Sequence, residues 1–402
     1  MFFLASENPL DHVTDLVLIG TKQQPILTMH TLTIIFVSLM FVLAMMRVAK
    51  AIATGPEGQG NAAAATVWKK LAAGDASTLL PILDAMDGAN DYTLNWLRPA
   101  FDAIADRELA AGGKLPLADF GKFLNETRHN PRARRLAFET VATIDAATAD
   151  QLLAGMLNDS SLEIRADAVQ KLMDQAGRSF TNGNKLGATL LFQQALNCAR
   201  DAKQIDTLAE KLDGLGQPVD LQKHFGFLTT WKVIGPFDNA GGKGFETVLP
   251  PEQKIDFAAE LDGKSGKVRW LDYASTNKYG AVDMNQPFGK LKQVAAYATT
   301  DFFSDQPRAV ELRLGGENSW KVWLNGKLLF GRDEYHRDVQ IDQYAMPAQL
   351  QPGRNTILVK VCQNEQVEEW TVAWEFQLRI TDALGTPIVS TANPSASNAK
   401  GN

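Results

Sequence analysis

The chain has 402 residues, enough for two or three domains at about 150 residues each. Hydrophobic residues make up 45% of the chain and charged residues 21%, values that exclude a fibrous or wholly disordered protein. The formal net charge of −6 argues against nucleic acid as the main partner. Two cysteines, Cys198 and Cys362, exclude a disulfide framework and lack the spacing of metal ligands. We therefore predict two partly buried thiols, no metal and no cofactor.

An apolar segment near the N-terminus predicts a membrane helix. Residues 26–46 carry no formal charge, and a helix of this length spans about 31 Å, enough for the hydrocarbon core of a bilayer. We predict a polar segment over residues 1–24, a transmembrane helix over residues 25–48 and a linker over residues 49–62. The membrane itself is thus one expected partner, reached by a single pass.

A cleaved signal peptide is the alternative, because Ala51 and Ala53 form a small-x-small cleavage pattern. The segment before the apolar run is net acidic, however, and Arg47 and Lys50 lie between that run and the cleavage pattern. Both features favour a retained anchor over a signal peptide. Positive residues next to a membrane helix tend to stay in the cytoplasm. The acidic segment before the apolar run and the basic residues after it therefore predict that the bulk of the chain is cytoplasmic.

The first 61 residues carry a resemblance. Residues 8–13 read NPLDHV, residues 29–31 read MHT and residues 51–57 read AIATGPE. This stretch resembles the N-terminus and first membrane helix of the a subunit of bacterial F-type ATP synthases. The resemblance implies the bacterial inner membrane and gives a second hypothesis for function, a component or fusion remnant of the synthase membrane sector. The later membrane helices of that family have no counterpart here, so proton translocation by this chain alone is not expected.

The middle of the chain, residues 63–216, has helical periodicity. Its segments place apolar residues at i, i+3, i+4 and i+7, and short breaks rich in Gly, Asp and Asn separate them. Residues 131–138 align with residues 162–169, which matches Arg134 with Arg165. The pattern resembles the second helix of HEAT-type repeats, and it implies a HEAT-like α-helical solenoid in which each helix pair stacks on its neighbour.

Basic residues are clustered around the first of these two aligned segments. Arg128, Arg132, Arg134 and Arg135 are candidates for a patch that docks a protein partner, with a solvated helix face as the alternative. For the matched pair Arg134 and Arg165 the alternative is a hydrogen bond to a turn or to a neighbouring carbonyl.

After Gln217 the periodicity changes from 3.6 to 2, which predicts an antiparallel β-sandwich over residues 217–388. The Asn-Gly pair at 325–326 predicts the two positive-φ positions of a hairpin turn. Residues 370–380 alternate so regularly that we predict the clearest strand there. Residues 389–402, rich in Ser, Asn and Ala, are typical of a disordered tail. The predicted fold class is therefore multi-domain α plus β.

Four sequence runs in this part carry a second resemblance. Residues 310–330, 350–363 and 374–388 resemble galactose-binding-like jelly-roll domains attached to many bacterial glycosidases and surface proteins, and residues 231–252 resemble the opening of such a module. With the helical part included, residues 60–388 resemble a bacterial envelope family of repeats plus sandwich. This resemblance implies the periplasm or cell envelope for the large domains, whereas the charge bias favours the cytoplasm.

A glycan is the ligand that the second resemblance and the residue types both favour. Trp323 should point away from the face that buries its two strand neighbours, and Asp333, Tyr335, His336 and Arg337 follow in the next loop. Sugars need aromatic faces for their apolar side and planar polar groups for their hydroxyls. The alternative is that Trp323 covers a neighbouring strand and that the charged loop is solvated.

The sequence contains no catalytic signature that we recognise. The glycine-rich residues 241–244 lack the glycine and the Ser/Thr that a phosphate-binding loop needs, and the five histidines are scattered. We therefore predict a non-enzymatic, membrane-anchored binding or scaffold protein, with helical repeats for protein contacts and the sandwich for a glycan or another surface ligand. A polysaccharide-acting enzyme is the third hypothesis, and it needs paired carboxylates in a cleft.

Overall fold

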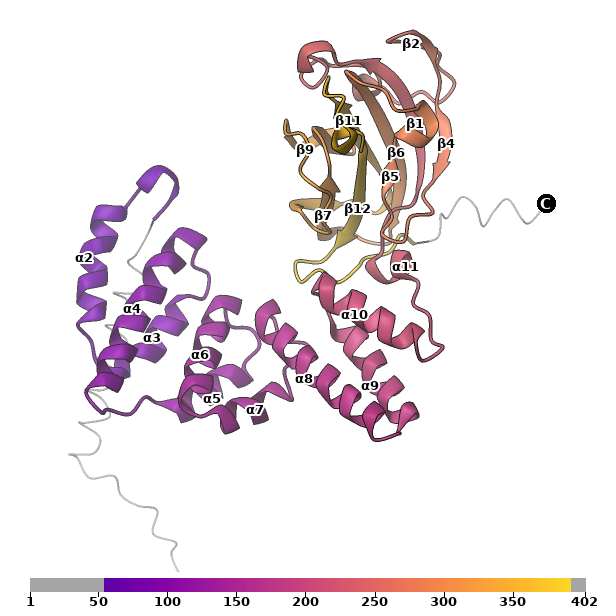
Figure 1. Ribbon diagram of the computed structural model, residues 1–402. Helices are drawn as coiled ribbons and strands as arrows, with labels where there is room; N and C mark the ends of the chain where they lie inside the picture. Colours follow the sequence, from indigo (N-terminus) through magenta and orange to yellow (C-terminus); the bar gives the residue numbers. More distant parts are fainter. Residues whose placement is uncertain (1–53, 392–402) are drawn as a thin grey trace, which may run out of the picture. The chain divides into compact units, whose positions relative to one another are not determined.

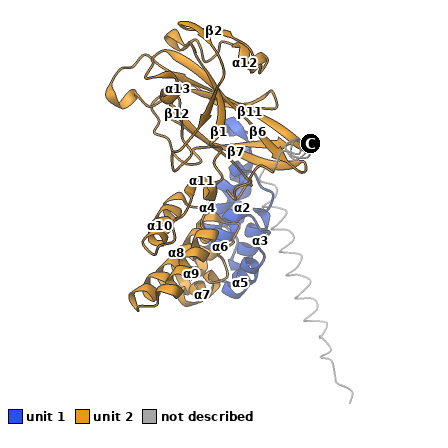
Figure 2. Cartoon of the chain, turned by 90° about the vertical axis from the view of Figure 1, so that its right-hand side faces the viewer, with its two compact units in different colours: residues 1–137 blue, residues 138–402 orange. Residues whose placement is uncertain are grey.

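The computed structural model describes residues 54–391. All described helices of eight or more residues lie before Thr230, and the sheets follow (Figure 1). The chain divides into two compact units, residues 1–137 and residues 138–402 (Figure 2), so the division lies within the helical part. The predicted order, a helical part followed by antiparallel sheets, is confirmed.

Unit 1 contains short helices that bury one face each. The longest, α4, begins where the Asn90 side chain accepts a hydrogen bond from the Thr93 backbone N–H at 2.9 Å, as N-cap residues do. Leu97, Phe101 and Ile104 recur on its buried face at helical spacing. The elements are η1 (Pro56–Gly58), α2 (Asn61–Ala72), η2 (Ala76–Thr78), α3 (Leu79–Ala85), α4 (Asp91–Ala110), α5 (Leu117–Asn125) and the first half of α6 (Pro131–Ile144).

Unit 2 opens with further capped helices. Ser161, Asn184 and Asp201 each accept a hydrogen bond from a backbone N–H in the first turn of the helix that follows. From Val169 onward the helices share one apolar cluster, and they continue to Phe225, beyond the predicted limit at residue 216. The elements are α7 (Ala146–Leu153), α8 (Leu162–Thr181), α9 (Lys185–Cys198), α10 (Ala202–Asp213) and α11 (Leu221–Phe225).

The two matched arginines are both buried, with 0% of Arg134 and 4% of Arg165 exposed. The Arg134 guanidinium donates to the Glu126 carbonyl oxygen at 2.7 Å. Arg165 donates to the Cys198 carbonyl oxygen at 2.6 Å and to Asn158 Oδ1 at 3.2 Å. Each arginine therefore donates hydrogen bonds to a preceding turn or to a neighbouring carbonyl, which is the alternative given above for the matched pair. Carbonyl oxygens satisfy donors that burial removes from water.

The sheet region consists of two antiparallel sheets whose apolar faces pack together in a sandwich-like arrangement. One sheet has six strands in the order β4-β1-β6-β11-β8-β9, and the other has four in the order β10-β7-β12-β5. The bounds are β1 (Thr230–Asp238), β4 (Leu271–Ala274), β5 (Val282–Asp283), β6 (Val294–Ser304), β7 (Arg308–Gly316), β8 (Trp320–Leu324), β9 (Lys327–Arg332), β10 (Tyr344–Leu350), β11 (Gly353–Gln363) and β12 (Glu375–Thr381). A separate hairpin contains β2 (Leu261–Gly263) and β3 (Gly266–Val268), and α13 (Asn285–Phe288) precedes β6.

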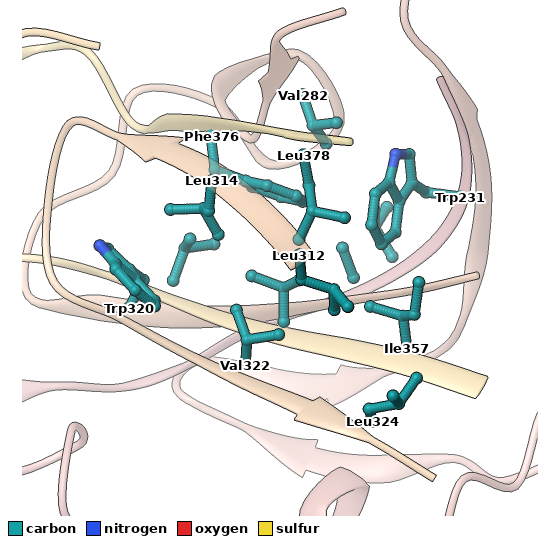
Figure 3. Packing of buried hydrophobic residues seen from close by; sticks show 14 of the residues in the cluster. Trp231, Val282, Leu312, Leu314, Trp320, Val322, Leu324, Ile357, Phe376 and Leu378 are labelled. Atoms are coloured by element: carbon teal, nitrogen blue, oxygen red, sulfur yellow. The ribbon is translucent and has the colours of Figure 1, made fainter. Parts of the chain in front are cut away.

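The core between the two sheets is rich in aromatic and branched side chains (Figure 3). Trp231 and Phe376 meet edge to face at 5.2 Å between ring centroids, an arrangement that aromatic quadrupoles favour. Leu312 and Leu378 belong to neighbouring strands of the four-stranded sheet and face Val322 of the other sheet across this core (Figure 3). The apolar residues that alternate along these strands therefore lie on the faces that meet in the core.

Residues 370–380 do not form one continuous strand, contrary to the prediction. β12 begins only at Glu375, and residues Glu369–Thr371 form the 3₁₀ helix η4. Trp374 is completely buried, whereas Trp370 is 65% exposed. The Thr371 hydroxyl donates to backbone carbonyls of its own loop, a local hydrogen bond that competes with strand pairing.

The predicted hairpin turn is confirmed, because Asn325 and Gly326 have φ values of 52° and 78°. Within residues 54–391 no helix is both long and apolar enough to cross a membrane. The predicted transmembrane helix over residues 25–48 lies outside the described residues, as does nearly all of the stretch that resembles the synthase subunit.

Candidate functional site

A layer of chain covers the outer face of the six-stranded sheet, the face turned away from the four-stranded sheet. This cover segment, residues 239–270, contains η3 (Ala240–Gly242), α12 (Pro250–Gln253) and the β2–β3 hairpin. Its apolar side chains pack on Phe237, Tyr297 and Leu358 of the sheet in a second cluster. The central strands of this sheet are consequently buried on both faces.

Trp323 belongs to this second cluster and is 7% exposed, whereas its neighbours Val322 and Leu324 belong to the core between the sheets. The predicted direction of the Trp323 side chain therefore agrees with the structure. Because the cover segment packs over this face, the indole is mostly enclosed, and only part of it can meet a ligand.

A buried ion pair fastens the cover segment to the sheet. Lys360, on β11, has no exposed side-chain surface, and its ammonium donates to Glu252 Oε1 at 2.8 Å. The same ammonium donates to the carbonyl oxygens of Phe245 and Thr247 at 3.1 and 2.8 Å. All three protons of the ammonium are thereby used, as a buried charge requires.

Two further titratable groups lie beside this pair. The Tyr297 hydroxyl donates to the same Glu252 oxygen, and burial, together with that hydrogen bond and the nearby carboxylate charge, raises the pKa of Tyr297. Burial also raises the pKa of the Cys362 thiol to about 12. Both groups stay neutral near pH 7, and the Cys362 thiol is not a nucleophile there.

A cavity of about 360 Å³ opens beside α12, where the cover segment meets the ends of β6, β8 and β11. We call it the outer-face cavity. Its volume is within the range of small-molecule sites. Aromatic side chains, two carboxylates, two amides, a guanidinium and an ammonium all contribute to its wall. The lining residues are Pro251, Glu252, Gln253, Lys254, Ile255, Phe257, Asp301, Trp323, Asn325, Gly326, Arg354, Thr356 and Leu358.

Hydrogen bonds hold the polar wall of the outer-face cavity in place. Asp301 accepts from the Thr356 hydroxyl at 2.8 Å and lies 3.8 Å from the Arg354 guanidinium. Asn325 accepts from the Thr356 backbone N–H at 2.9 Å and donates to Asn355 at 2.9 Å. Fixed polar groups of this kind orient a ligand at little entropic cost.

The other predicted ligand residues lie at the opposite end of β8. Trp320, at the start of β8, pairs with Arg332 of β9, so the loop that begins at Asp333 starts beside Trp320 and not beside Trp323. The structure therefore does not bring Trp323 together with the charged loop, although the two are close in sequence. Sequence proximity misled here because the hairpin carries the chain back along β8 before the loop begins.

Within that loop, Tyr335 and His336 point inward and two charged residues do not. The Tyr335 hydroxyl accepts from Asn239 Nδ2 at 3.3 Å, and burial raises its pKa. The His336 ring lies edge-on to Trp370 at 5.1 Å, and both its ring nitrogens are buried without a partner among the described residues. Asp333 and Arg337 are exposed, and Arg337 contacts Glu334 at 3.2 Å.

The four arginines predicted to dock a partner do not form one exposed patch. Arg134 is fully buried and unavailable to a partner, because its guanidinium satisfies a carbonyl inside unit 1. Arg128 is exposed and pairs with Glu126 at 2.6 Å, and Arg132 is exposed and lies 3.4 Å from Asp91. Arg135 is partly exposed.

Sequence analysis missed the cover segment and the ion pair beneath it. One signal was available, because Lys360 interrupts an apolar run from Ile357 to Cys362 in which the structure buries every residue. A lysine inside such a run needs a buried partner. The partner, Glu252, is 108 residues away in sequence, and nothing local identifies it.

No protein-family model and no curated protein matches this chain. The similar solved structures include an anti-sigma factor domain-containing protein from Clostridium clariflavum, with 12% identity, a TM-score of 0.24 and coverage of 42% of this chain and 45% of that one. A GH31 alpha-xylosidase from Xanthomonas citri has 13% identity, a TM-score of 0.21 and coverage of 38% and 14%. A beta-glucuronidase from Faecalibacterium prausnitzii has 13% identity, a TM-score of 0.23 and coverage of 39% and 31%. The chain spans less than half the length of each of these proteins.

Proposed function

We propose that the sheet region is a non-enzymatic binding module for a carbohydrate or another hydroxylated surface ligand, which it holds in the outer-face cavity. The observation that carries this proposal is the composition of the cavity wall. Phe257 and the accessible part of Trp323 offer apolar faces, and Asp301, Asn325 and Arg354 offer planar hydrogen-bonding groups. This pairing is what a pyranose with one apolar face and a rim of hydroxyls requires.

The test is calorimetry and a glycan array with the full chain and with variants of two exposed wall residues. Arg354 and Phe257 are 67% and 51% exposed, so Arg354→Ala and Phe257→Ala should leave the fold intact. We expect each to weaken binding at least ten-fold. Matched controls are Arg308→Ala and Phe180→Ala, which remove an exposed arginine and an exposed phenylalanine that do not line this cavity. Absence of any carbohydrate binding by the full chain would remove the glycan proposal.

A second candidate function, hydrolysis of a polysaccharide, has one specific observation in its favour. Glu252 and Asp301 both line the outer-face cavity, and paired carboxylates flanking a bond are what glycoside hydrolysis needs. Glu252 is engaged by Lys360 and Tyr297, and Asp301 by Thr356. We therefore rank binding above hydrolysis. Release of reducing ends that stops in an Asp301→Asn variant would reverse this order.

We further propose that the helical part is a HEAT-like solenoid for protein contacts and that the sheet pair is a galactose-binding-like jelly roll. The similar burial and bonding of Arg134 and Arg165 supports the repeat. Two leucines on α9, Leu186 and Leu190, are 73% and 59% exposed, and a scaffold surface contains such residues. Chemical cross-linking in cells, followed by identification of peptides joined to α9, tests the protein-contact part.

Anchoring by residues 25–48 belongs to the same proposal and is tested with the intact chain. We expect it to sediment with membranes and to resist alkaline extraction, at its full mass of 44.0 kDa. A soluble product trimmed near Ala53 would instead identify an exported protein with a signal peptide. Co-purification with the ATP synthase would favour the alternative role in the synthase membrane sector. A C-terminal reporter that is active in one compartment only would assign the large domains to the cytoplasm or the envelope.

A further inference from the structure

A second cavity, of about 180 Å³, lies inside unit 2 between the last helices and the end of β12. We call it the junction cavity. Three of its lining side chains are cationic or can become so, Arg200, His224 and Arg379, and no lining residue is acidic. The lining residues are Asn197, Ala199, Arg200, Ile205, His224, Phe225, Arg379, Gly385, Thr386 and Pro387.

Arg200 retains unused hydrogen-bonding capacity. Its guanidinium donates to the carbonyl oxygens of Asn197 and Ala199 at 3.2 and 2.7 Å and to the Thr386 hydroxyl at 3.2 Å. Its Nε atom is buried without a partner, and no carboxylate lies within ion-pair distance of it in the part of the chain that the structure describes. A partly buried guanidinium without a counter-charge is costly, because burial removes the water that would otherwise solvate it.

The surrounding charges increase this cost. Arg379 is 3% exposed and is paired with Asp342 at 2.7 and 2.5 Å. Burial, followed by repulsion from Arg165, lowers the pKa of Arg200. Asp382, whose negative charge opposes this lowering of the pKa, accepts hydrogen bonds from backbone N–H groups of its own turn and does not line the cavity.

We propose that the junction cavity binds a small oxyanion of the phosphate or carboxylate class, with Arg200 as its main counter-charge. Guanidinium groups recognise such anions by charge-assisted hydrogen bonds in a fixed plane. At roughly 30 Å³ per water-sized group, the cavity holds one small anion and not a polymer. An anion here would occupy the seam between α9, α10, α11 and β12, and it would supply the negative charge that the wall lacks. This proposal is independent of the outer-face cavity.

The test is calorimetric titration of the full chain with sodium phosphate and, separately, with sodium acetate, against sodium chloride at equal ionic strength. We expect saturable binding of at least one of the two oxyanions, and the arm that saturates identifies the class. In Arg200→Gln we expect a loss of at least ten-fold in affinity, and in Arg200→Lys a smaller loss. Arg178→Gln, which removes an exposed arginine on α8 outside the cavity, should bind like the unaltered protein.

The unaltered protein also provides a readout that does not depend on a variant folding. Phosphate or acetate should raise its thermal unfolding midpoint more than chloride does at the same ionic strength, since a ligand that binds only the folded state stabilises it. Oxyanions that stabilise no more than chloride, or that bind Arg200→Gln as tightly as the unaltered protein, would overturn the proposal.

Discussion

Replacement of Lys360 by methionine is the sharpest test of how the cover segment is held. The change keeps most of the side-chain volume but removes the ammonium that contacts Glu252 and the carbonyl oxygens of Phe245 and Thr247. Lys360 is 0% exposed and Glu252 only 10% exposed, so the remaining carboxylate and both carbonyls stay largely shielded from water. Breaking such a buried pair by removing one partner costs about 3–5 kcal/mol.

The assay is urea unfolding followed by tryptophan fluorescence, because six of the eight tryptophans lie at residue 231 or beyond and report the sheet region. The control is Lys267→Met, which removes one member of an exposed ion pair whose side chains are 55% and 89% exposed. We expect the control to cost much less than Lys360→Met, because water and salt screen an exposed ion pair. A Lys360→Met variant that costs no more than this control would refute the argument that the ion pair fastens the cover segment.

Three further predictions follow from burial. Cys362 should resist a thiol reagent at pH 8 in the folded protein because burial raises the pKa of its thiol to about 12. The partly exposed Cys198 should react under the same conditions. Equal reaction rates at the two cysteines would contradict this prediction. Burial, followed by repulsion from two arginines, lowers the pKa of His224, so the folded state resists a proton that the unfolded state accepts near pH 6.5. The contribution of neutral His224 to stability is therefore present above that pH and is lost as the pH falls below it. In His224→Gln, the free energy of unfolding should change less between pH 7.5 and pH 5 than in the unaltered protein. Trp374→Ala should lower the free energy of unfolding by about 3–5 kcal/mol because the Trp374 side chain is fully buried. Trp370→Ala removes a side chain that is 65% exposed and should lower it by less than about 1 kcal/mol. Similar losses in the two variants would contradict this prediction.

Local chemistry explains which parts of the fold could be predicted. The turn at Asn325 and Gly326 follows from the two residues themselves, since few others accept positive φ. The helical part follows from the spacing of apolar residues, which a 3.6-residue period sorts onto one face. The strand predicted from residue 370 failed because alternation alone cannot distinguish a strand from an exposed turn of 3₁₀ helix, and the structure places Trp370 in such a turn.

The candidate site could be predicted only in part, because its residues come together from distant segments. Trp323 was correctly placed on the outer face, but the α12 residues that line the cavity with it come from a segment about 70 residues earlier in the chain, and no periodic pattern marked that segment as a cover. Asp301 and Arg354 meet through the antiparallel pairing of β6 with β11. Pairing of this kind depends on strand order, which the sequence of a single protein does not reveal.

The burial of β6 and β11 on both faces separates two kinds of evolutionary freedom. A substitution at a buried position on either face of these strands disturbs one apolar cluster or the other, so the buried middle of the strands tolerates little change. The cover segment, by contrast, contributes most of its polar residues to one wall of a cavity and to solvent. Changes there can alter which ligand is recognised without altering the sheets. Divergence in specificity among proteins of this architecture should therefore be concentrated in residues 239–270 and at the strand ends that line the cavity, with the buried middle of the strands acting as a constant frame.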